Sequence, residues 1–147
     1  MKKLLTMIVF AILFAVYPGF AIEKERIVGE WELFSLEDKT TGRKQTSAKG
    51  IYCRFYGGGT FMMTNLDTRL RTMWYWELKD NKLRMHRGGN MIELSGEAKF
   101  VVIEEPTEEK EGILHLIYEF YKSTKYRDKV TGKMRIRRSG PYIWRFK

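Results

Sequence analysis

The side chains that most often perform catalysis are few and widely separated in this sequence. His86 and His115 are its only histidines, and each lies in a different stretch of alternating apolar and polar residues. That alternation is typical of a β-strand, and we expect both imidazoles to point outward. A metal site needs closely spaced His, Cys and carboxylate ligands, which the sequence does not offer. The G-x-S-x-G and H-E-x-x-H motifs of hydrolases are absent as well.

Cys53 and a group of glutamates are the remaining candidates for chemistry. Cys53 is the only cysteine, so an internal disulfide is excluded, and its place in an apolar alternation predicts a buried core residue rather than a nucleophile. Five glutamates surround a predicted turn, which favours an acidic loop over a general-acid pair. They are Glu104, Glu105, Glu108, Glu109 and Glu111. We therefore predict no catalytic residues, no bound metal and no cofactor.

Large apolar and aromatic side chains are the candidates for binding. Eight of them fall on one face of the expected strands: Phe55, Phe61, Met63, Trp74, Trp76, Tyr118, Tyr142 and Trp144. Wide rings leave space that a flexible ligand fills, and Tyr hydroxyl and Trp N–H groups orient a polar head. Arg54, Arg84, Tyr118 and Tyr142 are the candidate polar anchors. The alternative is a core filled by these same side chains, without a cavity.

The C-terminal third is strongly basic. Ten Lys and Arg residues lie between positions 122 and 147, with Tyr126, Tyr142 and Trp144 among them. A surface of this kind attracts phosphates or an anionic membrane face. A second hypothesis is therefore a module that docks this basic face on an anionic envelope component or another protein. The simpler alternative is a solvated hairpin that keeps the protein soluble.

The first 21 residues have the three parts of a secretory signal peptide. Lys2 and Lys3 precede an apolar run over residues 4–17, and the small residues Gly19 and Ala21 stand at the −3 and −1 positions of a cleavage site. The apolar run is shorter than the roughly 20 residues that span a bilayer. A retained amphipathic anchor is the alternative. No cysteine follows directly, so we expect an unlipidated periplasmic or extracellular protein.

Cleavage after Ala21 leaves residues 22–147, which is the length of one domain. The formal net charge falls from +9 to +7 because Lys2 and Lys3 are lost. A basic exported protein meets anionic lipids or acidic glycans, whereas nucleic acid is not an expected partner outside the cytoplasm. We expect a small hydrophobic or amphipathic ligand and a monomeric or weakly associating chain.

Period-two alternation between Gly, Asn and Asp turns predicts an all-β domain of eight to ten strands. A helical turn is expected at residues 23–26. The expected strands are 28–36, 51–56, 60–66, 71–79, 82–87, 91–95, 98–105, 113–122, and 133–138 with 142–146 as a pair or one bulged strand. Residues 38–50 and 125–132 are expected to be loops. Short connections favour an antiparallel up-and-down β-barrel, since closure removes exposed edges. A β-sandwich is the alternative.

Three short motifs carry a resemblance to a known family. They are Gly29-Glu30-Trp31, then Gly58-Gly59-Thr60-Phe61, then Trp76-Glu77-Leu78 followed by Asp80-Asn81 and Leu83. In this order they resemble the bacterial lipocalin-like, calycin-type exported domains. The resemblance implies structural roles for Gly29 and Trp31, with Arg145 or Arg137 as the cation–π partner of Trp31. The sequence departs from the larger secreted lipocalins because it lacks their disulfide cysteines and a long helix after the barrel.

Overall fold

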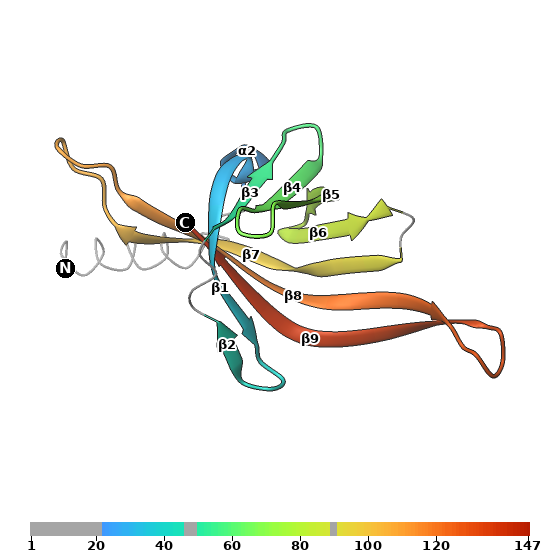
Figure 1. Cartoon of the computed structure of the whole chain (residues 1–147). Helices are drawn as coiled ribbons and strands as arrows, with labels where there is room; N and C mark the ends of the chain where they lie inside the picture. Colours follow the sequence, from blue (N-terminus) through green and yellow to red (C-terminus); the bar gives the residue numbers. More distant parts are fainter. Residues whose placement is uncertain (1–21, 46–49, 89–90) are drawn as a thin grey trace, which may run out of the picture.

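The computed structural model describes residues 22–45, 50–88 and 91–147, and these form nine β-strands and one short helix (Figure 1). The expected signal peptide, and the anchor that was its alternative, lie outside the described residues. In chain order the elements are α2 (Lys24–Ile27), β1 (Gly29–Asp38), β2 (Arg43–Gln45), β3 (Ile51–Phe55), β4 (Thr60–Asn65), β5 (Leu70–Lys79), β6 (Lys82–Arg87), β7 (Ile92–Glu104), β8 (Ile113–Arg127) and β9 (Met134–Phe146). No described helix is long and apolar enough to cross a membrane.

A single antiparallel sheet closes on itself in a barrel-like ring. Each strand from β3 to β9 pairs with the next along the chain, and β1 pairs with both β3 and β9. The first part of β1 pairs with β3 and its second part with β9, while β2 lengthens the sheet beside the end of β1. The expected all-β antiparallel class and the number of strands are confirmed for the described residues. One sheet in place of two excludes the β-sandwich alternative.

Three expected boundaries were wrong because strands continue through residues that resembled turns. Gly96 does not end a strand, and β7 runs through it as one element. The expected loop at 125–132 begins later, because β8 extends to Arg127. The expected loop at 38–50 contains the short strand β2. By contrast, β9 is one strand with a register shift near Gly140, which is one of the two expected forms.

The tight turn between β5 and β6 has the expected chemistry. Asp80 and Asn81 both have positive φ, 52° and 60°, as a two-residue turn of type I′ requires. Asp and Asn tolerate this left-handed region better than other side chains. The Asn81 side chain also accepts a hydrogen bond from the backbone N–H of Ile22 at 3.0 Å. The turn therefore ties the segment before α2 to this end of the ring.

One end of the ring is closed by packed side chains and by α2. Phe55 contacts Phe61, Trp76 and Phe146, with ring centroids 4.6, 5.3 and 6.1 Å apart. Ile27 of α2 belongs to the same buried cluster and is fully inaccessible. Lys24 lies over the Trp76 ring and Arg26 over the Phe100 ring, so α2 spans this end from β5 to β7.

Candidate functional site: the open end of the ring

The eight predicted ligand-binding residues all belong to one cluster on the inward face of the sheet. Phe55, Phe61, Trp76 and Tyr118 are buried in it, at 3% exposure or less. The buried Tyr118 hydroxyl donates a hydrogen bond to the Leu83 carbonyl at 2.7 Å. Burial raises the pKa of this phenol well above its ordinary value. These four side chains therefore fill the closed end and contact each other and their neighbours.

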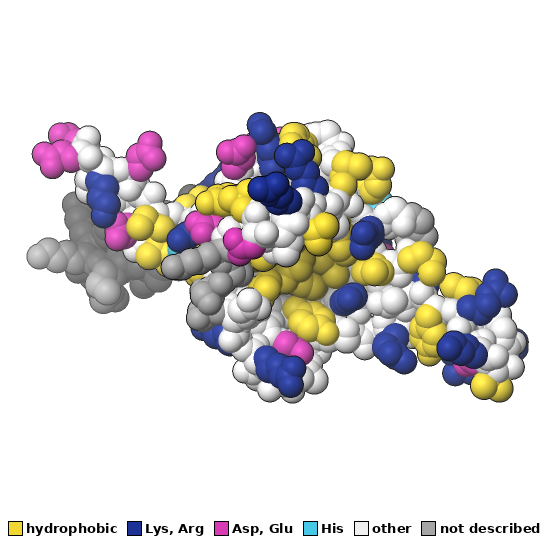
Figure 2. All heavy atoms as spheres, viewed as in Figure 1, with side chains coloured by type: hydrophobic (Ala, Val, Ile, Leu, Met, Phe, Trp, Pro, Cys, Tyr) yellow, Lys and Arg dark blue, Asp and Glu magenta, His cyan; other side chains and the backbone are white. Residues whose placement is uncertain are grey.

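The other four predicted residues pack against this cluster but are only partly buried, and each lies nearer the opposite, open end than the buried aromatic residue on its own strand. They are Met63, Trp74, Tyr142 and Trp144, and Leu36 and Ile51 are partly buried beside the same cluster. Hydrophobic surface is visible in the central hollow between the β1–β2 hairpin and strands β3 to β6 (Figure 2). The sequence predicted the inward face correctly for all eight. It did not separate the filled end from the open one.

Tyr142 links two hollows at this open end. Together with Trp144, Leu36, Arg43 and other residues of β1 and β2, it lines a hollow of about 530 Å³. It also lines a second hollow of about 400 Å³ with Lys122, Thr124, Tyr126, Arg137 and Ser139. We call the two together the mouth groove. Its aromatic part lies at the ring and its cationic part lies along one face of the β8–β9 hairpin.

Four cations that line the mouth groove are available to an anion. They are Arg43, Lys44, Lys122 and Arg137, and they form no ion pair with any other described residue. The Arg137 guanidinium lies 5.3 Å from the centroid of the Tyr126 ring, which holds it along the hairpin. The Tyr142 hydroxyl donates to Ser139 Oγ at 3.1 Å. The groove therefore places aromatic rings beside cations that outnumber its one unpaired carboxylate, Asp38.

The arginines expected to anchor a ligand inside the ring lie on its outer face. Arg54 pairs with Glu30 at 3.2 Å. Arg84 pairs with Glu93 at 3.0 Å and with Glu77 at 3.2 Å, and the hydrogen bond and charge of Glu93 raise the pKa of its guanidinium. Both arginines alternate with inward core residues, so strand geometry directs them outward. The expectation that they anchor an interior ligand was wrong.

The sequence indicated Lys122 only as part of the basic run and Arg43 only as part of a polar loop. It indicated Arg137 as part of the basic run and as a candidate partner of Trp31, and in neither case as part of a groove. The register of β8 and β9 shifts between Phe120 and Lys122. This irregularity decides which basic residues share a face with Tyr142. Strict alternation cannot locate it. The irregular sequence Ser139-Gly140-Pro141 was the available signal.

The family resemblance implies structural roles for Gly29 and Trp31, and the structure gives a separate reason for each. Gly29 has φ of 142°, a conformation that other residues rarely adopt, which accounts for glycine there. The Trp31 indole donates to the Ile27 carbonyl at 2.8 Å and stacks on Phe100 at 6.2 Å. Trp31 thus connects α2 to the closed end.

The expected cation–π partner of Trp31 was wrong. Arg145 alternates with Trp144 and Phe146 and therefore faces outward, where it pairs with Glu37 at 2.9 Å. Arg137 lies against Tyr126 on the β8–β9 hairpin. Among the described residues, the aromatic partner of Trp31 is Phe100, and the cation over that Phe100 ring is Arg26.

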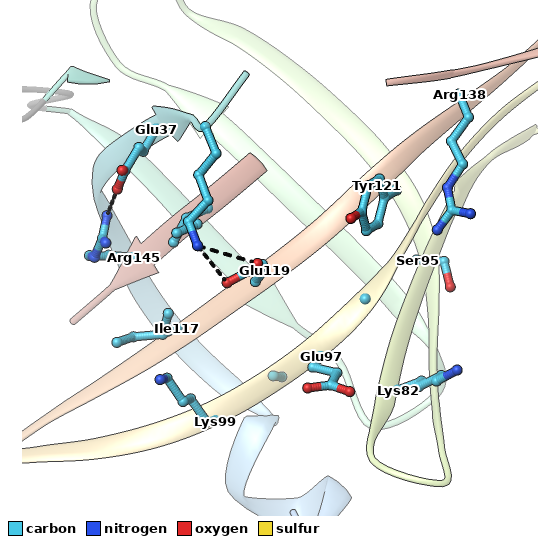
Figure 3. A pocket seen from close by; sticks show the side chains of 14 residues that line it. Glu37, Lys82, Ser95, Glu97, Lys99, Ile117, Glu119, Tyr121, Arg138 and Arg145 are labelled. Carbon is cyan, nitrogen blue, oxygen red and sulfur yellow. Dashed lines mark hydrogen bonds and ion pairs between the residues drawn. The ribbon is translucent and has the colours of Figure 1, made fainter. Parts of the chain in front are cut away.

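A further hollow of about 610 Å³ lies on the outer face of β1, β7, β8 and β9 (Figure 3). Two ion pairs, Arg145 with Glu37 and Lys39 with Glu119, neutralise one side of it. Lys82, Lys99 and Arg138 line it as well and form no ion pair with another described residue. We call this the outer hollow.

The remaining candidates for chemistry are isolated in the structure. Cys53 is buried and free, and burial raises the pKa of its thiol to about 12. The His86 ring stacks on Tyr75 at 5.4 Å, and the His115 ring lies 4.7 Å from Phe34. Partial burial and the charge of Lys147 lower the pKa of His115. No group of three metal-binding side chains occurs in the described part of the chain.

No protein-family model, curated protein sequence or solved structure matches this chain. Membership of the lipocalin-like family therefore stays a prediction based on the three short motifs.

Proposed function

We propose that the protein is an exported lipocalin-like carrier that binds an anionic amphipathic molecule in the mouth groove. The apolar part of the ligand lies against Tyr142 and Trp144 in the groove and extends along the inward face toward Trp74. Its anionic head is held by Lys122 and Arg137 on the β8–β9 hairpin, with Arg43 on the opposite side. This places the ligand at the mouth, since the deeper interior is occupied by side chains.

The observation that carries the proposal is the position of Tyr142. Its ring borders the aromatic hollow on one side and the cationic hollow on the other. A molecule with an apolar tail and an acidic head matches this arrangement. Its tail contacts the aromatic hollow and its head contacts the cationic hollow only when the ligand lies across Tyr142.

The energetics favour an amphiphile over a purely apolar ligand. Burying about 300 Å² of apolar surface contributes about 7–8 kcal/mol at roughly 25 cal/mol per Å². Association costs at least about 4 kcal/mol, which leaves weak binding from the apolar part alone. Charge-assisted hydrogen bonds from Lys122 and Arg137 to an anionic head add about 1.5–3 kcal/mol each. Affinity is therefore expected to depend on the head group as much as on the tail.

A fluorescence titration tests this dependence. Dodecyl phosphate and dodecylphosphocholine share one tail but differ in head-group charge, and both are added below their micelle concentrations. Quenching or a blue shift of tryptophan emission reports binding. We expect dodecyl phosphate to bind at least about tenfold more tightly, which corresponds to about 1.4 kcal/mol.

A pair of matched variants separates the groove from the general charge of the hairpin. The double variant Lys122→Glu and Arg137→Glu removes the preference for dodecyl phosphate. The control, Lys125→Glu and Arg127→Glu, makes the same change in net charge on the other face of the same hairpin and retains the preference. Equal binding of the two amphiphiles to the wild-type protein, or equal loss in both variants, would contradict the proposal.

A further inference from the structure

The two longest hairpins carry opposite charge. Residues 104–111, at the tip of the β7–β8 hairpin, contain five Glu and one Lys, and we call them the acidic arm. Residues 121–139, in the β8–β9 hairpin, contain eight Lys and Arg and one Asp, and we call them the basic arm. Outside the basic arm, residues 22–147 contain equal numbers of basic and acidic side chains. The basic arm therefore accounts for the whole positive net charge of residues 22–147.

The arms project from opposite ends of the molecule. In Figure 1 the acidic arm extends to the upper left and the basic arm to the lower right. Figure 2 shows Asp and Glu side chains at the first end and Lys and Arg at the second. Both arms grow from β8, and the eight residues of β8 between them, 113–120, separate their bases by roughly 25–30 Å. The two arms of one molecule therefore cannot reach each other.

The acidic arm has unneutralised charge beside exposed apolar residues. Lys110 pairs with Glu104 at 2.7 Å, while the other four glutamates form no ion pair with described residues. Val102 and Ile103, at its base, are 50% and 52% exposed. The pairing of β7 with β6 ends at Glu97. The residues of β7 after Glu97 therefore pair only with β8 in the described structure.

The basic arm presents matching features on the face opposite the mouth groove. Lys125 pairs with Ile136 and Arg127 with Met134, so these four residues share a face, and strand alternation separates them from Lys122 and Arg137. Ile136 and Met134 are 66% and 53% exposed. At the base of this face the Arg138 guanidinium lies 4.1 Å from the Tyr121 ring centroid. Tyr121 and Arg138 also line the outer hollow, so the basic face continues into it.

We infer that the acidic arm of one molecule docks along this outer face of the basic arm of a second copy. Charge complementarity selects the occupant, because each molecule offers one arm of each sign with exposed aliphatic side chains beside the charges. The contact joins two different surfaces, so it is heterologous and repeats head to tail into open chains or a ring. It uses the face opposite the mouth groove and does not depend on the proposed function.

Sedimentation velocity on the purified protein and two arm variants tests the inference. The acidic-arm variant carries Glu105→Lys, Glu108→Lys and Glu109→Lys, and the basic-arm variant carries Lys125→Glu, Arg127→Glu and Lys129→Glu. At low ionic strength we expect the wild-type mass to rise with concentration and to return to the monomer in about 0.5 M salt, where screening is strong. Each variant alone is expected to stay monomeric.

Mixing the two variants is the decisive step. The intact basic arm of one variant and the intact acidic arm of the other form one complementary contact, so the mixture is expected to give a 1:1 dimer that does not grow further. A control with Arg69→Glu, Arg71→Glu and Lys79→Glu changes net charge by the same amount as the basic-arm variant, in β5 and the turn before it, away from both arms. This control is expected to assemble like the wild type.

Three results would overturn the inference. One is a wild-type protein that remains monomeric at low salt at every soluble concentration. The second is assembly that the mixed variants do not restore as a dimer, or that the control variant also loses. The third is a monomer whose basic arm binds anionic phospholipid vesicles through Lys125, Arg127 and Lys129, which would assign this arm to a lipid surface.

Discussion

At the scale of single residues, the inward side chains have two different tasks. Phe55 and Tyr118 are buried to about 1% exposure or less and hold the closed end together. Trp74 and Trp144 lie on the same face but remain partly exposed at the open end. Residue type and alternation are the same in both groups. What differs is the position along the ring, and this decides which residues are structural and which are free to bind.

Cys53 gives the protein a defined weakness at alkaline pH. Its thiol has an ordinary pKa of 9.0, which burial raises to about 12 in the folded chain. Between pH 9 and 10 the unfolded chain therefore loses a proton that the folded chain keeps, and stability falls as pH rises. One such group accounts for a slope of about 1 kcal/mol per pH unit. Above pH 10 the raised pKa of Tyr118 acts in the same direction.

Urea denaturation at pH 8, 9 and 10 measures this slope in the wild type and in Cys53→Ala. The variant is less stable overall, since it leaves a small cavity, but its stability should fall less between pH 9 and 10. Parallel slopes for the two proteins, or fast alkylation of Cys53 in the folded wild type at pH 9, would refute the assignment.

The Tyr118 hydroxyl is a second residue whose role can be measured. It makes the hydrogen bond to the Leu83 carbonyl across the closed end. Tyr118→Phe keeps the ring but leaves this buried carbonyl without its partner, which costs about 1–3 kcal/mol. The free energy of unfolding from urea titration reports the loss. Tyr75→Phe, at an exposed tyrosine on the outer face, is the control and is expected to change stability by less than about 0.5 kcal/mol. If Tyr118→Phe lowers the free energy of unfolding no more than the control does, the hydrogen bond to Leu83 does not stabilise the closed end.

At the scale of elements, the pairing of β7 with β8 depends on Gly96. A Cβ at this position would overlap the backbone of Glu119 and Phe120 on β8. The two strands therefore approach more closely than a side chain permits, and this explains why a glycine occurs within a long strand instead of ending it. The interpretation of residues 91–105 as two strands was wrong because the sequence does not show the approach of a distant strand.

Substitution of Gly96 by alanine should separate β7 from β8 and lower stability by about 1–3 kcal/mol. Thermal unfolding measured by circular dichroism is the appropriate test. Gly57→Ala is a matched control, because nothing lies within 4 Å of a Cβ at that turn position. If the two substitutions lower the melting temperature equally, close packing at Gly96 does not explain the unbroken strand.

At the scale of the whole molecule, much of the fold could be predicted from the sequence. Alternation located most of the strands, and the Asp80-Asn81 turn and the short connections indicated neighbouring antiparallel strands. The burial of Cys53 followed from the same pattern. The length of β7, β8 and β9 could not be predicted, because these strands extend beyond the ring as two-stranded arms whose polar residues resemble loops.

The candidate site was only partly predictable for a related reason. Its aromatic residues lie on the inward face, which alternation identifies. Lys122 and Arg137 lie on an arm whose register shifts near Gly140. The outward positions of Arg54 and Arg84 show how readily a basic residue is assigned to the wrong face. Whether a face is filled or open depends on strands from distant parts of the sequence meeting at each end of the ring.

The central claim is that one end of the ring is filled and that the other receives an anionic amphiphile. The four tryptophans report on it directly, because Trp74 and Trp144 lie at the open end while the Trp31 and Trp76 indoles donate to backbone carbonyls at the closed end. The measurement is an NMR titration of the indole N–H signals, assigned by single Trp→Phe variants, with dodecyl phosphate carrying a nitroxide at its tail. The account predicts that the Trp74 and Trp144 signals broaden first and that those of Trp31 and Trp76 persist. Broadening that begins at Trp31 and Trp76, or that is uniform across the four signals, would contradict it.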